Sequence, residues 1–139
     1  MSMNVFVDTN VLIDVLAKRE PFYDDSARVW TLAERGQVNG SISVISFNNI
    51  YYVVRKLRNR QAANRMMQLL RDTFTPIALD KQILDQAIDA RFEDLEDAIQ
   101  YFSAMRVRAE CIISRDARVF PQSELPVLTP AEFLTTGSF

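Results

Sequence analysis

Short apolar runs alternate with longer amphipathic segments along the whole 139-residue sequence. We predict strands over residues 3–7, 42–45, 75–80, 110–116 and 126–128, because these runs are apolar or rich in β-branched residues. Between them, apolar residues recur with helical spacing over residues 10–17, 24–35, 47–57, 61–74, 81–90 and 95–107. This alternation predicts an α/β chain with three layers, α/β/α, around a mostly parallel sheet of four to five strands. The length predicts a single domain over residues 1–139.

Residues that commonly cap helices lie at the predicted helix boundaries. Gly36 follows residues 24–35, in the position where glycine often ends a helix. Ser46 is the predicted N-cap of the helix over residues 47–57. Further N-caps are predicted at Asn59, Asp80, Asp94 and Thr129.

The composition narrows the class of protein. No apolar run approaches the ~20 residues that a membrane-spanning helix needs. The first residues, MSMNVFVD, lack the basic region and the cleavage site of a signal peptide. The single cysteine, Cys111, has no partner in the chain for a disulfide. These features predict a cytoplasmic protein that does not act in a membrane.

The sequence contains no histidine, which restricts the chemistry available to it. A Ser-His-Asp or Cys-His catalytic arrangement is excluded. One cysteine without histidine also supplies too few ligands for a common zinc site. Catalysis by this chain would depend mainly on carboxylates, which are hard oxygen ligands suited to Mg²⁺ or Mn²⁺.

Four aspartates are candidates for such a site. Asp8 and Asp116 follow predicted strands, and the carboxyl ends of parallel strands lie at the edge of a sheet where active sites form. Asp94 and Asp97 are three residues apart at a predicted helix start, so both can point in one direction. A divalent cation would relieve their mutual repulsion and lower the pKa of a bound water. The alternatives are an acid-rich first turn that only caps the helix and general acid–base chemistry without metal.

Basic residues are concentrated before residue 72, and acidic residues after it. No Asp or Glu occurs between Gly36 and Arg71, whereas Arg55, Lys56 and Arg58 lie close together in that stretch. These side chains are candidates for contacts with nucleic-acid phosphates. A solvated helix face or a surface for a protein partner explains them equally well.

Several segments together resemble PIN-domain ribonucleases. They are VDTNVLIDVL, SVISFNNIYYVVRK, FEDLEDAIQYFSA, IISRD and PVLTPAEFL, in this order, and they cover essentially the whole chain. The resemblance implies a PIN-like fold and cleavage of RNA with Mg²⁺ or Mn²⁺. Many such proteins are VapC-type toxins of bacterial toxin–antitoxin pairs, so it also implies a small antitoxin partner and a homodimer.

The same resemblance assigns roles to individual residues. It implies that Asp8, Asp97 and Asp116 are metal ligands, with Asp94 as a further ligand or base. Thr9 and Asn10 would brace Asp8, and Ser114 would help to shape the site.

The sequence departs from the family pattern at two positions. Asn49 stands where many PIN domains carry a glutamate on the middle helix, and a subgroup shares this asparagine. An asparagine can contact a metal through its oxygen but brings no charge. Val119 stands where an acidic residue often precedes the equivalent of Phe120.

Two other functions remain open from the sequence. A PIN-like module weakened at Asn49 would bind RNA or a protein without cleaving it. A phosphohydrolase with a DxD motif is less well supported, because Asn10 replaces the second acid. Asp14 is expected to face away from the site.

Overall fold

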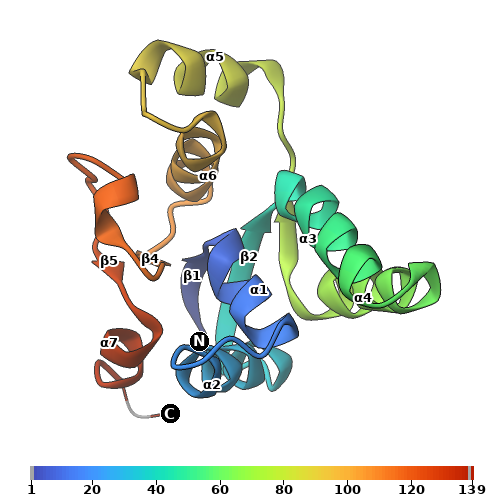
Figure 1. Cartoon of the computed structure of the whole chain (residues 1–139). Helices are drawn as coiled ribbons and strands as arrows, with labels where there is room; N and C mark the ends of the chain where they lie inside the picture. The colour runs from blue at the N-terminus through green and yellow to red at the C-terminus, as the bar shows by residue number, and fades with distance from the viewer. Residues whose placement is uncertain (1, 138) are drawn as a thin grey trace.

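The computed structural model describes residues 2–137 and 139. Within these residues, five strands form one sheet in the order β3-β2-β1-β4-β5, and every neighbouring pair is parallel (Figure 1). Their bounds are β1 Met3–Val7, β2 Val38–Ser43, β3 Thr75–Ile77, β4 Cys111–Ile113 and β5 Val127–Leu128. Strand β1 lies at the centre of this sheet, between β2 and β4.

Helices connect the strands and cover the sheet. They are α1 Thr9–Leu16, α2 Tyr23–Glu34, α3 Val44–Leu57, α4 Arg60–Thr73, α5 Lys81–Ala90, α6 Leu95–Arg106 and α7 Pro130–Leu134, with a 3₁₀ turn, η1, over Ala117–Val119. The predicted N-caps are confirmed, since the side chains of Asn59, Asp80, Asp94 and Thr129 each accept a hydrogen bond from a backbone N–H of the following helix.

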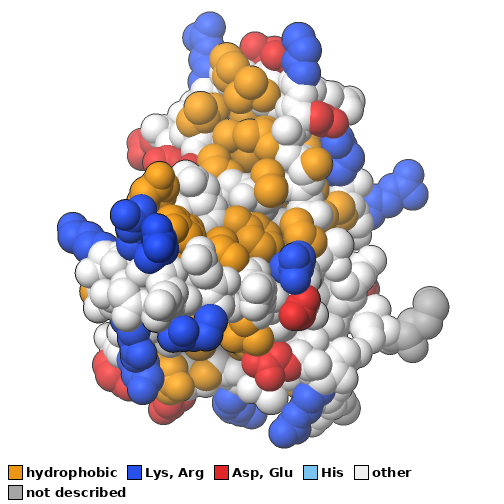
Figure 2. Space-filling view, turned by 90° about the vertical axis from the view of Figure 1, so that its right-hand side faces the viewer, with side chains coloured by type: hydrophobic (Ala, Val, Ile, Leu, Met, Phe, Trp, Pro, Cys, Tyr) orange, Lys and Arg blue, Asp and Glu red, His pale blue; other side chains and the backbone are white. Residues whose placement is uncertain are grey.

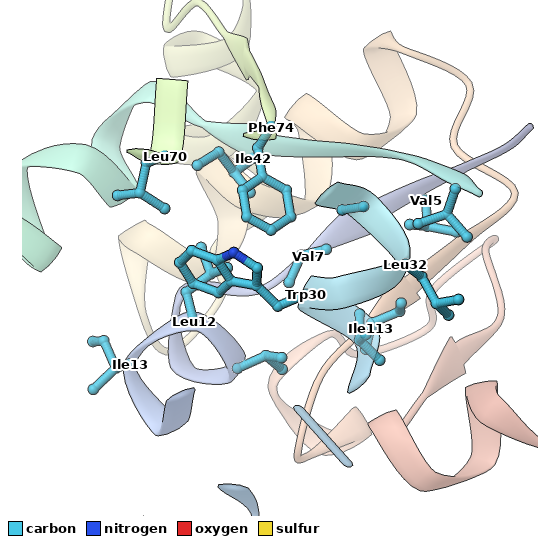
Figure 3. Close-up of a cluster of buried hydrophobic side chains, with 14 of the residues drawn as sticks. Val5, Val7, Leu12, Ile13, Trp30, Leu32, Ile42, Leu70, Phe74 and Ile113 are labelled. Atoms are coloured by element: carbon cyan, nitrogen blue, oxygen red, sulfur yellow. The ribbon is translucent and has the colours of Figure 1, made fainter. Parts of the chain in front are cut away.

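Alternate residues of the central strand face two separate cores. Val5 and Val7 belong to a large cluster with Trp30 of α2, Ile50 of α3 and Leu70 of α4. The close-up in Figure 3 shows the side chains of this cluster gathered around Trp30, with Phe74 beside it. The two rings meet edge to face, with centroids 5.2 Å apart. Helices α1, α2, α3 and α4 therefore cover one face of the sheet.

The opposite face is covered by α6, and α5 packs on α6. Phe6 of β1 and Ile112 of β4 pack with Tyr101 and Ala104 of α6. Between α5 and α6, Ile83 and Ala87 meet Ala98 and Ile99. The three-layer α/β/α architecture predicted from the sequence is thus confirmed.

The second strand was misplaced by the sequence prediction. Strand β2 spans Val38–Ser43, whereas Val44 and Ile45 already lie in α3. The N-cap of α3 is Ser43, whose Oγ accepts a hydrogen bond from the N–H of Ile45, so the predicted cap at Ser46 is wrong. Small polar residues make up most of β2, VNGSIS, and they lack the β-branched signal on which the prediction relied.

Strand β1 has the predicted bounds, whereas β3, β4 and β5 are shorter than predicted because their ends become loops or caps. Strand β3 ends at Ile77, and β4 covers only Cys111–Ile113. The segment after β4 leaves the sheet because Ser114 and Asp116 form a turn that leads into η1. No helix within residues 2–137 has the length and apolar character needed to cross a membrane. The cytoplasmic location stays a prediction.

Candidate active site

The strand order creates a crevice between β1 and β4. Strands β2 and β3 lie on one side of β1, whereas β4 and β5 lie on the other side. Ligands in open α/β sheets commonly bind at such a switch point, outside the carboxyl ends of the strands. Asp8 follows β1, and Ser114 and Asp116 follow β4. The backbone N–H of Asp8 donates to the carbonyl of Ile113 at 2.9 Å and joins the two strand ends.

Asp8 is a buried carboxylate at the start of α1. Its side chain caps α1 by accepting a hydrogen bond from the N–H of Asn10 at 3.3 Å. Its second oxygen accepts the hydroxyl of Ser114 at 2.8 Å. Burial raises the pKa of the Asp8 carboxyl, although both hydrogen bonds oppose that shift. Ser114 therefore contacts Asp8 directly, and Asn10 does so through its backbone.

Thr9 joins α1 to two other helices rather than to Asp8. Its N–H and its hydroxyl both approach Oε1 of Gln100, at 3.0 and 3.2 Å. Its hydroxyl also forms a hydrogen bond with the Ser46 hydroxyl on α3. Gln100 is fully buried on α6, and the sequence analysis did not identify it. The sequence feature that could have identified Gln100 is its amide on the otherwise apolar face of the helix over 95–107.

Asp94 and Asp97 lie at the start of α6, as predicted, Asp94 as the N-cap and Asp97 in the first turn. Asp94 caps the helix by accepting a hydrogen bond from the N–H of Asp97 at 3.0 Å. Burial raises the pKa of Asp97 to about 7, and the charges of Asp8, Asp94 and Glu96 add to this shift. The charge of Asp8 thus acts on Asp97, so these carboxylates belong to one electrostatic cluster.

Glu96 is a further acidic residue of this cluster that the sequence analysis did not select. Its Oε1 accepts a hydrogen bond from Nδ2 of Asn49 at 2.7 Å, which links α6 to α3. Burial raises the pKa of Glu96, hydrogen bonds from Asn49 and Thr9 oppose the shift, and the charges of Asp94 and Asp8 reinforce it. Asn49 on α3 carries no charge itself, but it lies beside the Glu96 carboxylate of α6.

Asp116 is paired with a cation of its own segment. Both of its oxygens accept hydrogen bonds from the Arg118 guanidinium at 2.9 Å, and one also accepts the N–H of Arg118. These hydrogen bonds hold the pKa of Asp116 below its usual value. The N–H of Asp116 donates to Ser114 Oγ at 3.2 Å, so Ser114 joins Asp116 to Asp8.

Two neighbouring hollows share Asp116, Arg118 and Val119 as a common wall. The first, of about 460 Å³, is also lined by Glu93, Asp94, Asp97 and Pro121. The second, of about 420 Å³, is also lined by Asp8, Asn10, Phe22, Ser114 and Arg115. The four predicted aspartates therefore lie along two adjoining hollows.

The donor set suits a hard divalent cation. Every candidate ligand is an oxygen, and the repulsion felt by Asp97 is the kind that a cation relieves. In the described part of the chain, however, no three acidic side chains are close enough together to enclose an ion. The residues fit Mg²⁺ or Mn²⁺ chemically, but ion binding would require the carboxylates to turn toward one another.

The predicted RNA contacts lie further along α3. Arg55 and Lys56 occupy its last turn and Arg58 caps its C-terminus, about two turns beyond Asn49. Figure 2 views the side of the molecule that carries α3 and α4, where basic side chains surround exposed hydrophobic ones. The part that Arg55, Lys56 and Arg58 play in RNA binding stays a prediction.

Comparison with known sequences identifies a family. A sequence model of the PIN domain matches residues 4–118. The chain is also 28% identical over 137 residues to "Ribonuclease VapC1" of Aquifex aeolicus (strain VF5), covering 95% of this chain and 94% of that protein.

Solved structures share the fold over most of the chain. A toxin–antitoxin complex from Klebsiella pneumoniae has a chain 25% identical, with a TM-score of 0.67 and coverage of 91% of this chain and 97% of that one. VapBC-1 from nontypeable Haemophilus influenzae is 18% identical, with a TM-score of 0.69 and coverage of 93% and 99%. VapC20 from Mycobacterium tuberculosis, a sarcin-ricin loop cleaving toxin, is 15% identical, with a TM-score of 0.65 and coverage of 83% and 92%.

Proposed function

Because the chain belongs to the PIN-domain family, we propose that it is a Mg²⁺- or Mn²⁺-dependent endoribonuclease that hydrolyses RNA phosphodiester bonds. The observation that carries this proposal is the meeting of Asp8 and Asp116 at the carboxyl ends of β1 and β4, where the Ser114 side chain contacts both residues. Two carboxylates from segments far apart in the sequence share one site, and their repulsion favours a cation between them. Similarity to ribonuclease VapC1 supports the same activity.

We assign the metal to Asp8, Asp97 and Asp116, with Asp94 as a further ligand or base. When bound, Mg²⁺ or Mn²⁺ lowers the pKa of a water molecule and stabilises charge on a phosphoryl group. The Ser114 hydroxyl and the Asn10 N–H hold Asp8 in place, while the amide of Gln100 fixes the start of α1 against α6. Asp116 would have to exchange its contacts with Arg118 for the ion.

Asn49 acts on the ion through Glu96 in this proposal. Its Nδ2 donates to Glu96 and keeps that carboxylate at the edge of the cluster near Asp8 and Asp94. Glu96 thereby supplies the negative charge that many PIN domains place on the middle helix. Direct contact of the Asn49 oxygen with the metal, which the resemblance implies, stays a prediction.

The direct test compares RNA cleavage by the wild type and by Asp8→Asn in Mn²⁺. We expect cleavage by the wild type, its loss in EDTA, and a loss of at least about a hundredfold in the variant, because Asp8 is a ligand. Asp72→Asn is a matched control, since Asp72 is exposed on α4 and pairs with Arg71. Equal cleavage by the wild type and Asp8→Asn would refute the proposal.

The alternative is a PIN-domain module that binds RNA or a protein partner without cleaving RNA. The absence of a charge at Asn49 favours it. Calorimetry with Mn²⁺ separates the two functions, because a metal-dependent nuclease must bind the ion. No heat of binding at millimolar Mn²⁺, together with no cleavage, would favour the module.

We further propose that the chain is the toxin of a toxin–antitoxin pair. A groove of about 440 Å³ between the end of α1 and helices α3 and α4 is lined by apolar residues such as Leu57, Met66 and Leu69. Lys18, Arg58 and Arg65 also line it, so an acidic, amphipathic partner segment would complement it (Figure 2). Co-purification with a small protein encoded beside this chain tests the pairing. Homodimerisation stays a prediction.

A further inference from the structure

Asp14 is a buried acid that the proposed reaction does not use. Its side chain has no exposed surface, and neither of its oxygens accepts a hydrogen bond from a described residue. It lines neither of the two hollows, and its orientation away from the site stays a prediction. Arg115 Nε lies 2.9 Å from one oxygen, and Arg19 Nη1 lies 4.0 Å from the other. A buried carboxylate is costly unless it is paired, so Arg115 is its main compensation.

Arg115 is held from a second direction by Phe22. The guanidinium carbon lies 4.6 Å from the centroid of the Phe22 ring, which is a cation–π contact. Arg115 and Phe22 line the same hollow as Asp8 and Ser114. Arg115 thus combines a buried anionic anchor, an aromatic face and a position beside the candidate active site.

The other arginine of this hollow is already engaged. Arg118 is largely exposed and donates to both oxygens of Asp116. Arg115 meets Asp14 through Nε, and its side chain keeps 27% of its surface exposed. A guanidinium offers five N–H donors and binds phosphate in a fixed, forked geometry. The terminal amino groups of Arg115 are therefore available to an anion that enters the hollow.

We infer that Arg115 binds a phosphate group of the RNA strand beside Asp8, and that Asp14 is the positioning residue that holds the guanidinium there. This inference rests on the proposed function, because it takes RNA as the ligand. Arg115 would give the acidic site a fixed cation for a polyanionic substrate. This role also explains why α1 keeps the charged side chain of Asp14 inside an apolar core.

Binding without metal tests this inference separately from cleavage. We would measure the anisotropy of a short fluorescent single-stranded RNA with the full chain in EDTA, over a range of salt concentrations. Arg115→Gln is expected to weaken binding about tenfold and to reduce the salt slope by about one. Arg115→Lys keeps the charge and should keep the slope. Arg35→Gln is the matched control, because Arg35 is exposed at the end of α2.

Two further variants separate positioning from folding. Arg115→Gln leaves Asp14 unpaired and destabilises the fold, so the double variant Asp14→Asn/Arg115→Gln removes both charges together. It should fold and bind RNA as weakly as Arg115→Gln. Asp14→Asn alone should weaken binding, and its effect should disappear in the double variant.

The outcomes are distinguishable. If the folded double variant binds RNA like the wild type, or if the wild type does not bind RNA in EDTA, the inference is wrong. If Arg115 affects binding but the wild type does not cleave RNA in Mn²⁺, the phosphate site stands and the proposed nuclease activity fails. If Asp14→Asn binds like the wild type, Asp14 has no positioning role.

Discussion

At the scale of single residues, Gln100 shows how a buried amide organises the site. Its Oε1 is the acceptor for both the N–H and the hydroxyl of Thr9, next to Asp8. Gln100→Leu keeps the size of the side chain but leaves the Thr9 N–H buried without an acceptor. We expect the free energy of unfolding to fall by about 2 kcal/mol. Urea denaturation of the wild type and the variant measures this loss.

An exposed glutamine provides the control for Gln100. Gln86 lies on the solvent-facing side of α5, so Gln86→Leu should change stability by no more than about 0.5 kcal/mol. Equal midpoints for Gln100→Leu and Gln86→Leu would show that the contact with Thr9 contributes little.

The residues that the sequence analysis missed have a common reason. Asp8, Asp94, Asp97 and Asp116 could be proposed because each lies at an element end. Glu96 and Gln100 lie within α6, four residues apart and on one helix face, where sequence alone does not show which neighbour the face meets. Arg115 and Asp14 depend on a contact between the segment after β4 and α1 that only the fold reveals.

At the scale of elements, β2 is the strand that the sequence pattern did not locate correctly. The other strands carry apolar or β-branched residues and were located, β1 with the predicted bounds and β3, β4 and β5 with different ends. Strand β2 uses Gly40, Ser41 and Ser43 because helices press closely on it. A Cβ at Gly40 would lie 2.8 Å from Cδ1 of Phe74. The small residues of β2 are thus explained by the close packing of neighbouring side chains against this strand. A scale of strand propensity contains no information about such packing.

This close approach makes Gly40 sensitive to substitution. Gly40→Ala should lower the free energy of unfolding by about 1–3 kcal/mol, because the buried Phe74 ring has to move. Chemical denaturation measures the loss. The double variant Gly40→Ala/Phe74→Leu should lose less stability than the sum of the losses measured for Gly40→Ala and Phe74→Leu alone. The reason is that the smaller leucine side chain removes the clash with the new Cβ. Simple additivity would argue against a steric cause.

Asp80 ties α5 to α6 by an interaction that depends on pH. It caps α5 through the N–H of Ile83 and accepts two hydrogen bonds from Arg106 of α6. The Arg106 hydrogen bonds and the cap lower its pKa from 3.8 to about 2. A carboxyl whose pKa is lower in the folded state stabilises the fold above its unfolded pKa, and this contribution is lost as pH falls toward 2.

Asp80→Asn should therefore lower Tm at pH 7, because the amide can still cap α5 but carries no charge for Arg106. The difference in Tm between wild type and variant should shrink as pH falls from about 4 toward 2. Thermal denaturation followed by circular dichroism across this range measures it. A difference that does not change with pH would assign the loss to packing instead of charge.

At the scale of the whole molecule, the strand order determines where the acids meet. Strand β1 lies between β2 and β4, so Asp8 and Asp116 reach one edge although 107 positions separate them in the chain. The start of helix α6 lies near the same edge and adds Asp97 from a third segment. The parallel alternation in the sequence predicted this edge, but the pairing of Asp116 with Arg118 and the division into two hollows required the structure.

Convergence of like charges predicts that a divalent cation stabilises the entire fold. An ion that binds only the folded chain adds RT ln(1 + [ion]/Kd), or about 2.7 kcal/mol at a hundredfold excess over Kd. The Tm of the wild type should therefore rise with Mn²⁺ concentration. Asp97→Asn should show a smaller rise, because it lacks one of the proposed ligands. It should also be more stable than the wild type in EDTA, since it lacks the charge that burial and the charges of Asp8, Asp94 and Glu96 all disfavour.

Differential scanning calorimetry in EDTA and in increasing Mn²⁺ measures both effects. Asp72→Asn serves as the control, because Asp72 is exposed and remote from the cluster in sequence. It should follow the wild type at every ion concentration. If Asp97→Asn gains as much from Mn²⁺ as the wild type does, the ion binds elsewhere on this acidic chain and the crevice between β1 and β4 is not the metal site.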